Sequence, residues 1–372
     1  MKRLGFLLAG IIIVALIFGA IGCGGEEATP TPKPTAAPTA APTVTAAPTA
    51  TPVPTPTIPT MEPVTWKLTH GYPEDGSRGK VATKFKELVE EYTDGKITVD
   101  VFHNSTLFSK DRSWEATVTG AVDVDLCVPY FAAKAVPWFG VLYVGGMFEN
   151  YEHARNILLD PRLLDLMKSD VEPLGIYPLG LMLNSVNAGD LTKVEVTEMA
   201  DLRGIKSGLR PGAPVTASMK YRDLTLVEIP SEEQVTAFQT GLIDHLSWGI
   251  ETLIAWECWE LADYVLISMQ CLDATALNVS KKSWDALPAY YQDIIENKVF
   301  PEVQEYAFQL VEEVEGGAVD LLSEHMTVHV ATPEDMAKMW NTIKEWPEME
   351  ATMEMAGPEL LQIIDENRPS AK

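Results

Sequence analysis

The strongest limit on the possible folds comes from an alternation of strand and helix patterns that begins at Thr65. Residues Thr65 to His70 alternate as a half-buried strand does, and from Arg78 to Tyr92 apolar residues recur at the three- and four-residue spacings of an amphipathic helix. Asp94-Gly95 ends this helix, and a second strand is predicted from Ile97 to Phe102. Strand–helix–strand order favours an α/β fold with a mostly parallel sheet flanked by helices.

The pattern continues through a second alternating unit. The further predicted elements are helices at Asp111 to Thr119 and Pro214 to Arg222, and strands at Val122 to Cys127, Leu174 to Leu183, Leu224 to Ile229 and Ile243 to Trp248. From Trp284 to Glu315 the pattern is helical, and Pro301 is expected to kink or divide that helix because proline lacks an N–H group. Ligands of such sheets bind beyond the carboxyl ends of the strands, so the loops there are candidate walls of a binding site: His70 to Ser77, His103 to Phe108 and Val128 to Trp138.

The first residues resemble an export leader. Lys2 and Arg3 precede an almost unbroken apolar run from Leu4 to Phe18, and Ala20-Ile21-Gly22-Cys23 resembles a bacterial lipobox. We therefore expect a lipoprotein signal peptide over 1–22, with Cys23 as the lipidated first residue of the mature chain. The alternative is an uncleaved transmembrane anchor, because the apolar run is close to the shortest length that spans a bilayer.

The segment after Cys23 is expected to remain unfolded. From Ala28 to Thr60 only Lys33, Val44, Val53 and Ile58 are not Thr, Pro or Ala. Such a segment has too little apolar surface to offset the entropy lost on folding. Its prolines favour an extended conformation with a reach of about 100 Å at most. The sequence thus predicts a stalk over 23–63 that holds the globular part outside the cytoplasm, anchored to the cell membrane.

Charge and cysteine content exclude several classes of function. The chain has 28 basic and 53 acidic residues, a net charge of −25, and the part after Met61 has 25 basic and 51 acidic residues, a net charge of −26. Such a surface repels phosphate backbones, so we expect no nucleic-acid partner. Three further cysteines, Cys127, Cys258 and Cys271, lack metal-ligand spacing, and their odd number leaves at least one free thiol unless a partner chain pairs with it.

Seven segments, in order along the chain, resemble the substrate-binding proteins of tripartite ATP-independent periplasmic (TRAP) transporters. They are Trp66-Lys67-Leu68-Thr69-His70, Glu90 to Ile97, Val101-Phe102-His103-Asn104, Thr119 to Asp123, Asn150 to Arg155, Phe238 to Asp244, and Asn278 to Pro288. The resemblance runs from about Trp66 to Glu315. It implies a two-lobed, periplasmic-binding-protein-like α/β fold whose lobes are linked by crossing strands and a long helix.

The resemblance also implies the domain boundaries and the activity. The first lobe is expected to comprise 64–185 and about 275–313, and the second lobe 186–274 and about 314–372. Such proteins close on a small solute between their lobes and deliver it to membrane permease subunits, without a cofactor. Two rival functions stay open: a surface sensor that signals ligand occupancy to a membrane receptor, and a surface enzyme.

One expected site residue departs from the family pattern. Family members hold a ligand carboxylate with an arginine just after a segment that matches Leu202 to Lys206, where this chain has Gly208. Arg210, two residues on, is the predicted substitute, because strand residues two apart share a face. Trp248 matches a family site position, but Ser247 stands where one branch has a metal-binding glutamate, so no metal ion is expected.

Four more residues complete the predicted ligand site. Tyr72 lies in the first loop, Tyr130 and Trp138 follow the third strand, and Asn184 lies at the crossover between the lobes. Aromatic side chains offer flat apolar walls with one polar group each. They suggest an organic acid, with an aromatic or branched carboxylate favoured and an uncharged ligand as the alternative.

Other polar clusters give weak signals for chemistry. His325 and His329 are four residues apart, but the residues between them favour a strand, which argues against a helical metal site. Asp123 and Asp125 share one face of a short strand, and structural hydrogen bonds are the expected role of Asp123. The sequence contains no phosphate-binding glycine loop, nucleophile elbow or zinc signature. We therefore expect a binding protein and not an enzyme.

Overall fold

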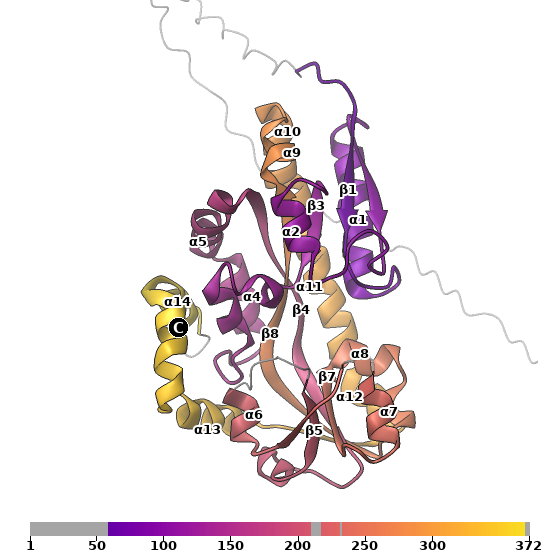
Figure 1. The fold of residues 1–372 in the computed structure, drawn as a ribbon, viewed down its shortest axis with the longest axis vertical. Coiled ribbons are helices and arrows are strands. Elements are labelled where there is room, and N and C mark those ends of the chain that lie inside the picture. Colours follow the sequence, from indigo (N-terminus) through magenta and orange to yellow (C-terminus); the bar gives the residue numbers. More distant parts are fainter. Residues whose placement is uncertain (1–58, 210–216, 231–232, 369–372) are drawn as a thin grey trace, which may run out of the picture. The chain divides into compact units, whose positions relative to one another are not determined.

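A computed structural model describes residues 59–209, 217–230 and 233–368 (Figure 1). The predicted signal peptide, Cys23 and all but the last residues of the predicted stalk lie outside these ranges, as does Arg210. The helices of the described part of the chain are either too short or too polar to cross a lipid bilayer.

One mixed sheet runs through the described part of the chain, in the order β2-β1-β3-β8-β4-β7-β5-β6, with β9 paired to β8. Its strands are β1 (Val64–Thr69), β2 (Ile97–Phe102), β3 (Val124–Cys127), β4 (Ile176–Thr192), β5 (Lys206–Leu209), β6 (Thr225–Glu228), β7 (His245–Gly249), β8 (Tyr264–Ser280) and β9 (Thr327–Val330). Pairing of β1 with β2 and β3, and of β5 with β6 and β7, is parallel, as the sequence predicted.

Two long antiparallel strands, β4 and β8, join two groups of shorter strands. Strand β3 pairs with the end of β8 at 276–279, whereas β7 pairs with the end of β4 at 188–192. We call β1–β3 with the adjoining ends of β4 and β8 the first lobe, and β5–β7 and β9 with the other ends the second lobe. Figure 1 shows both long strands passing from one group to the other. The predicted strand from Leu174 to Leu183 is therefore only the first half of β4.

The helices flank this sheet. They are α1 (Ser77–Tyr92), α2 (Ser113–Val118), α3 (Pro129–Ala132), α4 (Tyr151–Leu159), α5 (Pro161–Val171), α6 (Ala217–Tyr221), α7 (Gln234–Gln239), α8 (Ile250–Ala255), α9 (Lys281–Asp285), α10 (Ala289–Ile294), α11 (Phe300–Gly316), α12 (Ala318–Ser323), α13 (Pro333–Ile343) and α14 (Pro347–Glu366). In α1 the periodic residues Val81, Phe85, Leu88 and Val89 are buried, which confirms the predicted amphipathic face. That helix ends before Asp94 and Gly95, both of which have positive φ angles.

Pro301 is the second residue of α11 and lacks the N–H group that a continuing helix would use. A π-helical turn, Ile295–Val299, joins α10 to α11 immediately before it. Pro301 thus marks a change of hydrogen-bonding pattern between α10 and α11. The carboxylate of Glu315, near the end of α11, accepts hydrogen bonds from Ser185 Oγ, at 2.6 Å, and from the amide of Val186, at 3.0 Å, where β4 changes register.

The last helix packs against first-lobe segments. His153 Nε2 in α4 lies 2.7 Å from the carbonyl oxygen of Ile364 in α14, and Arg162 in α5 forms an ion pair with Glu366. For α14 alone, this packing differs from the expected placement of 314–372 in the second lobe, because its last turns contact α4 and α5.

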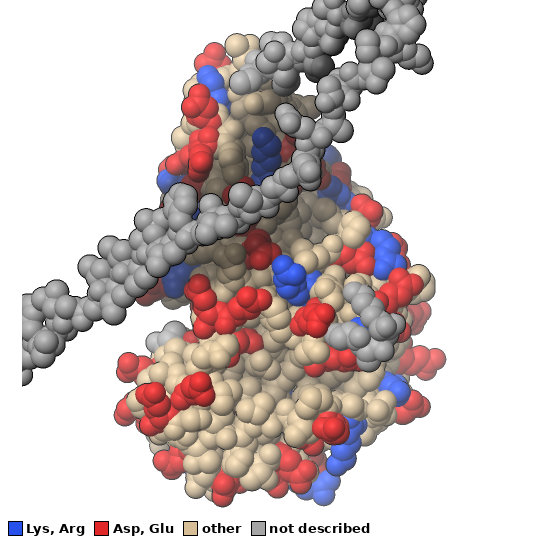
Figure 2. Space-filling model, turned by 180° about the vertical axis from the view of Figure 1, so that it is seen from behind, with Lys and Arg blue, Asp and Glu red and all other residues tan. Residues whose placement is uncertain are grey.

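Acidic side chains are spread over the face seen in Figure 2, and basic ones are fewer there. This distribution agrees with the net charge of −25. An arginine or lysine in a binding site of this acidic protein is therefore an exception, and its position has to be explained by the groups around it.

Candidate ligand-binding site

A cavity of about 880 Å³ is lined by residues of both lobes. The first lobe contributes the loop after β1, from Gly71 to Arg78, and Tyr130 after β3. The second lobe contributes residues at the ends of β5 and β7, including Gly208 and Trp248. Since these loops follow the carboxyl ends of parallel strands, the cavity lies where ligands of such sheets bind.

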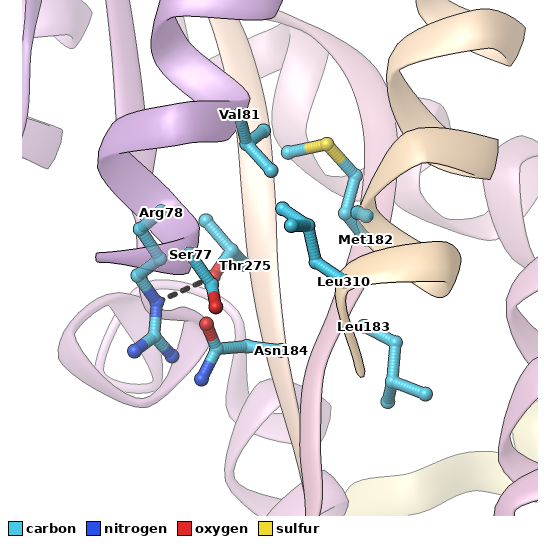
Figure 3. A pocket seen from close by; sticks show the side chains of 9 residues that line it. Ser77, Arg78, Val81, Met182, Leu183, Asn184, Thr275 and Leu310 are labelled. Carbon is cyan, nitrogen blue, oxygen red and sulfur yellow. Dashed lines mark hydrogen bonds between the residues drawn. The ribbon is translucent and has the colours of Figure 1, made fainter. Parts of the chain in front are cut away.

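Arg78 connects α1 to the crossing strand β8. Its Nη2 donates to both carboxylate oxygens of Asp273, at 2.8 and 2.9 Å, and its Nε donates to Thr275 Oγ1 at 2.8 Å. Figure 3 shows the bond to Thr275, with Arg78 and Asn184 reaching toward each other from α1 and β4. Burial lowers the pKa of Arg78, but Asp273 outweighs burial and raises it overall. The ion pair therefore fixes one wall of the cavity.

Asn184 contributes to this cluster and does not line the large cavity. Its Nδ2 donates to Asp273 Oδ2 at 2.9 Å, and its side chain lines a separate cavity of about 10 Å³, roughly enough for one water molecule. The amide thus orients the partner of Arg78. Asn184 was expected on the wall of the solute site, and the structure places it in the second rank, against Asp273.

Tyr72 lies on the cavity wall beneath Arg78. The guanidinium carbon of Arg78 is 4.4 Å from the centre of the Tyr72 ring, a cation–π contact. The loop is held against α1 at Gly79, where an added Cβ would lie 2.1 Å from the carbonyl oxygen of Pro73. Only glycine allows this close approach, so Gly79 lets the loop that carries Tyr72 pack against α1.

His70 holds the same loop in place through a hydrogen bond to its backbone. Its Nδ1 accepts a hydrogen bond from the amide of Tyr72 at 3.2 Å, and its Nε2 lies 2.9 Å from His103 Nδ1. Burial, helped by His103 and Arg78, lowers the pKa of His70 to about 4. A neutral imidazole with its proton on Nε2 satisfies both contacts at once.

Trp248, at the end of β7, lines the second-lobe side of the cavity. Its ring packs edge to face against Trp256, with centroids 5.3 Å apart, and Trp256 is exposed at the cavity wall. The two indoles provide an apolar surface of the kind that covers the carbon skeleton of a small ligand.

The two aromatic residues predicted after β3 have different positions. Tyr130 lines the cavity and packs against Tyr143, with ring centroids 5.5 Å apart. Trp138 is buried in the core, where its Nε1 donates to Asp170 at 2.9 Å and its ring packs on Phe139. The indole N–H is satisfied by α5, so Trp138 does not form the expected part of the wall.

Gly208 lines the cavity where the arginine was expected. A Cβ at this position would lie 3.1 Å from the side chain of Gln234, which covers it. Gln234 in turn donates to the carbonyl oxygen of Ile229 at 3.3 Å. The position therefore offers no cation, and its predicted substitute, Arg210, lies outside the described residues.

A buried arginine that no sequence pattern indicates, Arg222, follows α6 and lines the cavity. It is 2% exposed, and its Nη1 lies 3.7 Å from Asp190 Oδ1, beyond hydrogen-bond distance. Its Nε and Nη2 are buried and have no hydrogen-bond partner among the described residues. Asp190 also lies 2.9 Å from His245 Nε2, and His245 Nδ1 lies 2.8 Å from Ser207 Oγ. Burial raises the pKa of Asp190, but Arg222 and His245 outweigh burial and lower it to about 2.

Tyr143 is a second missed residue of the wall. It is the last residue of the 3₁₀ segment η1 (Pro137–Tyr143), and its hydroxyl is buried without a hydrogen-bond partner within residues 59–209, 217–230 and 233–368. Burial raises its pKa well above the ordinary value, so the hydroxyl keeps its proton. No periodic pattern in the sequence distinguishes Tyr143 from Trp138, because both lie in one short apolar segment.

A hydrogen bond at the wall of the cavity joins the two lobes. Glu251 in α8 accepts from the amide of Ser77, the first residue of α1, at 2.6 Å. An acidic group is favoured there, because the first amides of a helix are unpaired and the helix dipole is positive at this end. The contact joins the two lobes in the described conformation.

The remaining candidate groups have structural partners. Asp123 accepts from the amide of Lys67 at 2.8 Å and from Ser283 Oγ at 2.5 Å, and buried Asp125 accepts from Asn278 at 3.0 Å. His329 lies in β9, as its strand pattern predicted, and contacts Glu195. Across the described ranges no group of three His, Cys, Asp or Glu residues is placed to hold a metal ion.

The cysteines outside the predicted stalk are free thiols. Cys127 and Cys258 are buried, and Cys271 lines the cavity. Burial, with help from Asp273 and Glu315, raises the pKa of Cys271 far above its ordinary value. A thiol that stays protonated is a poor nucleophile.

Comparison with known proteins agrees with this architecture. The profile of the DctP family, described as bacterial extracellular solute-binding protein, family 7, matches residues 68–351. The C4-dicarboxylate-binding periplasmic protein DctP of Rhodobacter capsulatus is 26% identical over 285 residues, which cover 76% of this chain and 85% of that protein.

Two solved structures share the fold. A TRAP periplasmic solute-binding protein from Ochrobactrum anthropi, with its C-terminus bound in the ligand-binding pocket, has a TM-score of 0.75 and 22% identity, and the match covers 82% of this chain and 95% of that one. A sugar-acid-binding protein from Advenella mimigardefordensis, in complex with galactonate, has a TM-score of 0.71 and 20% identity, with coverage of 84% and 100%.

Proposed function

The chain belongs to family 7 of the bacterial extracellular solute-binding proteins, the DctP-like TRAP family, and we propose that it captures a small organic acid in the cavity between its lobes. Members of this family are extracytoplasmic transport proteins that deliver small-molecule ligands to TRAP membrane permease subunits. The observation that carries the proposal is the cavity of about 880 Å³ with walls from both lobes.

The wall chemistry supports an organic acid as the solute. Tyr72, Tyr130 and Trp248 supply apolar surfaces, and the cavity lies in a chain whose net charge is −25, so a bound anion needs a local cation. Arg222 supplies a buried one. The ligands named for similar proteins, C4-dicarboxylate and galactonate, are carboxylates.

Closure follows from contacts with both walls. A solute that touches the Tyr72 loop and Trp248 at the same time binds the closed form better than the open form, and this difference in affinity drives closure. The bond between Glu251 and the amide of Ser77 adds a direct contact between the lobes. Water is then excluded from the cavity, which strengthens each polar contact with the solute.

A thermal-shift screen of organic acids tests the proposal. A ligand at about 100 times its Kd stabilises the protein by about 2.7 kcal/mol. For a chain of this size, this stabilisation raises Tm by on the order of 5 °C. We expect a hydroxylated or branched carboxylate to give such a shift and Trp248→Ala to abolish it, because the indole wall is lost.

Trp259→Ala is the matched control. Trp259 is a partly buried tryptophan in the same lobe that stacks on His325 and does not line the cavity, so its removal should leave the ligand-induced shift in place. Unchanged affinity in Trp248→Ala would remove that residue from the site. If no carboxylate stabilised the wild-type chain, the organic-acid proposal would fail.

We also propose that Cys23 carries a lipid that holds the protein at the outer face of the cell membrane. The charged and apolar leader, the lipobox-like sequence and the Pro/Thr/Ala-rich stalk support this proposal. The mature protein should be found in the membrane fraction with an acylated Cys23, and Cys23→Ser should release it or leave it unprocessed. An unmodified Cys23 in the mature wild-type protein would contradict the proposal.

A further inference from the structure

Arg222 is the least satisfied charged group in the cavity wall of the described residues. Two of its three guanidinium nitrogens are buried without a hydrogen-bond partner in the part of the chain that the structure describes, and the third lies 3.7 Å from Asp190. Leaving a buried charged donor unsatisfied is costly, and native structures retain such groups mainly where a role compensates for the cost. A ligand that supplies the missing acceptors would recover this free energy on binding.

The other buried arginine of the wall already has its acceptors. Arg78 donates to both oxygens of Asp273 and to Thr275. Asp190, in contrast, lies too far from Arg222 for a hydrogen bond: its Oδ1 is 3.7 Å from Nη1 and 2.9 Å from His245 Nε2. A guanidinium presents two parallel N–H groups to one planar carboxylate, and the unpartnered Nε and Nη2 atoms form such an edge.

A second unsatisfied group lies in the wall contributed by the segment after β3. The Tyr143 hydroxyl is buried, has no partner and remains protonated because burial raises its pKa. It is an uncharged group that suits a hydroxyl or carbonyl oxygen of a ligand, not a second carboxylate.

We infer that Arg222 binds the carboxylate of the solute and that the Tyr143 hydroxyl binds a second, uncharged oxygen, so that the ligands are small hydroxy- or oxo-carboxylates. This inference rests on the proposed function and assigns the polar contacts within that site. The aromatic rings of Tyr130 and Trp248 then cover the carbon skeleton between the two polar ends.

Titration of a defined panel tests the assignment. The probes are lactate, malate, pyroglutamate, galactonate and succinate, with galactitol as the uncharged counterpart of galactonate, each measured by calorimetry. We expect a hydroxy- or oxo-carboxylate to bind and galactitol not to bind. Arg222→Lys keeps a cation beside Asp190 but loses the planar edge, so affinity should fall by about 100-fold.

Tyr143→Phe tests the proposed contact between the Tyr143 hydroxyl and the ligand. It removes only the hydroxyl, so it should weaken the bound hydroxy- or oxo-carboxylate by about tenfold while leaving any binding of succinate unchanged. Lys80→Ala is the matched control, because Lys80 is an exposed cation on the same cavity. Its removal should change affinity by less than about threefold, as expected for exposed charges.

The outcomes separate the inference from the proposed function. Failure of every carboxylate to bind the wild-type chain would contradict both. Binding of a carboxylate with equal affinity by the wild type and Arg222→Lys would overturn only the role of Arg222, as would a loss confined to Lys80→Ala. If Arg222→Lys did not fold, equal binding of galactonate and galactitol by the wild type would overturn the carboxylate contact, and an unaffected Tyr143→Phe would overturn the hydroxyl contact.

Discussion

Replacing Asp273 by alanine is expected to lower the free energy of unfolding by about 3–5 kcal/mol, because the substitution leaves the Arg78 charge buried without a partner. The side chains of Arg78 and Asp273 are only 12% and 24% exposed. Asn184 also loses its acceptor, since its Nδ2 donates to Asp273. Urea denaturation of the two proteins at pH 7 measures the difference.

An exposed ion pair serves as the control. Arg203 and Asp223 lie 3.0 Å apart with side chains 79% and 65% exposed, so Asp223→Ala should cost less than about 1 kcal/mol. Removing both members of the buried pair, in Arg78→Met with Asp273→Leu, should cost less than Asp273→Ala alone. An equal decrease in the free energy of unfolding for Asp273→Ala and Asp223→Ala would show that the ion pair between Arg78 and Asp273 does not stabilise the protein.

Acidification is expected to destabilise the protein by about 3 kcal/mol through His70 alone as the pH falls from 6.5 toward 4. The folded state keeps His70 neutral down to a pKa of about 4, whereas the unfolded chain binds this proton at the ordinary pKa of 6.5. The stabilising effect of the neutral ring is therefore fully present above pH 6.5 and is lost as the pH falls through this window.

His70→Gln isolates this contribution from the other titrating groups. Glutamine keeps a hydrogen-bonding amide but takes up no proton, so its free energy of unfolding should fall by about 3 kcal/mol less between pH 7 and pH 4. Chemical denaturation at several pH values gives both curves. Parallel curves for the wild type and the variant would mean that His70 does not titrate as the buried geometry requires. Because His70 accepts from the amide of Tyr72 and stays neutral in the folded state down to about pH 4, ligand affinity should weaken through this contact only as the pH falls below about 4.

Local patterns predicted much of the fold. The periodicity of Val81, Phe85, Leu88 and Val89 identified α1 and its buried face, and the alternation after Thr65 identified the first parallel strands. Such signals depend on backbone geometry within one or two turns, so neighbouring residues are enough to reveal them. The segments that resemble TRAP substrate-binding proteins predicted the family that the match over residues 68–351 shows.

The candidate site was predicted less completely. Tyr72, Tyr130 and Trp248 line the cavity, and their binding roles stay predictions. Trp138 and Tyr143 share one 3₁₀ segment, and only packing against α5 places the first in the core and the second on the wall. Arg222 was missed because it follows a short helix without any motif, and its lack of partners is a property of the folded chain.

The sequence by itself determined the alternation of strands and helices, the acidic surface and the family, because these depend on residue order and composition over short spans. Only the tertiary structure decided which charges meet. Asp273 lies 195 residues from Arg78 along the chain, and Asp190 reaches both His245 and Arg222 from a different strand. Side chains so far apart in sequence are brought together by the pairing of β4 with β7 and β8, and among the described residues Nε and Nη2 of Arg222 stay buried beside the cavity without a partner.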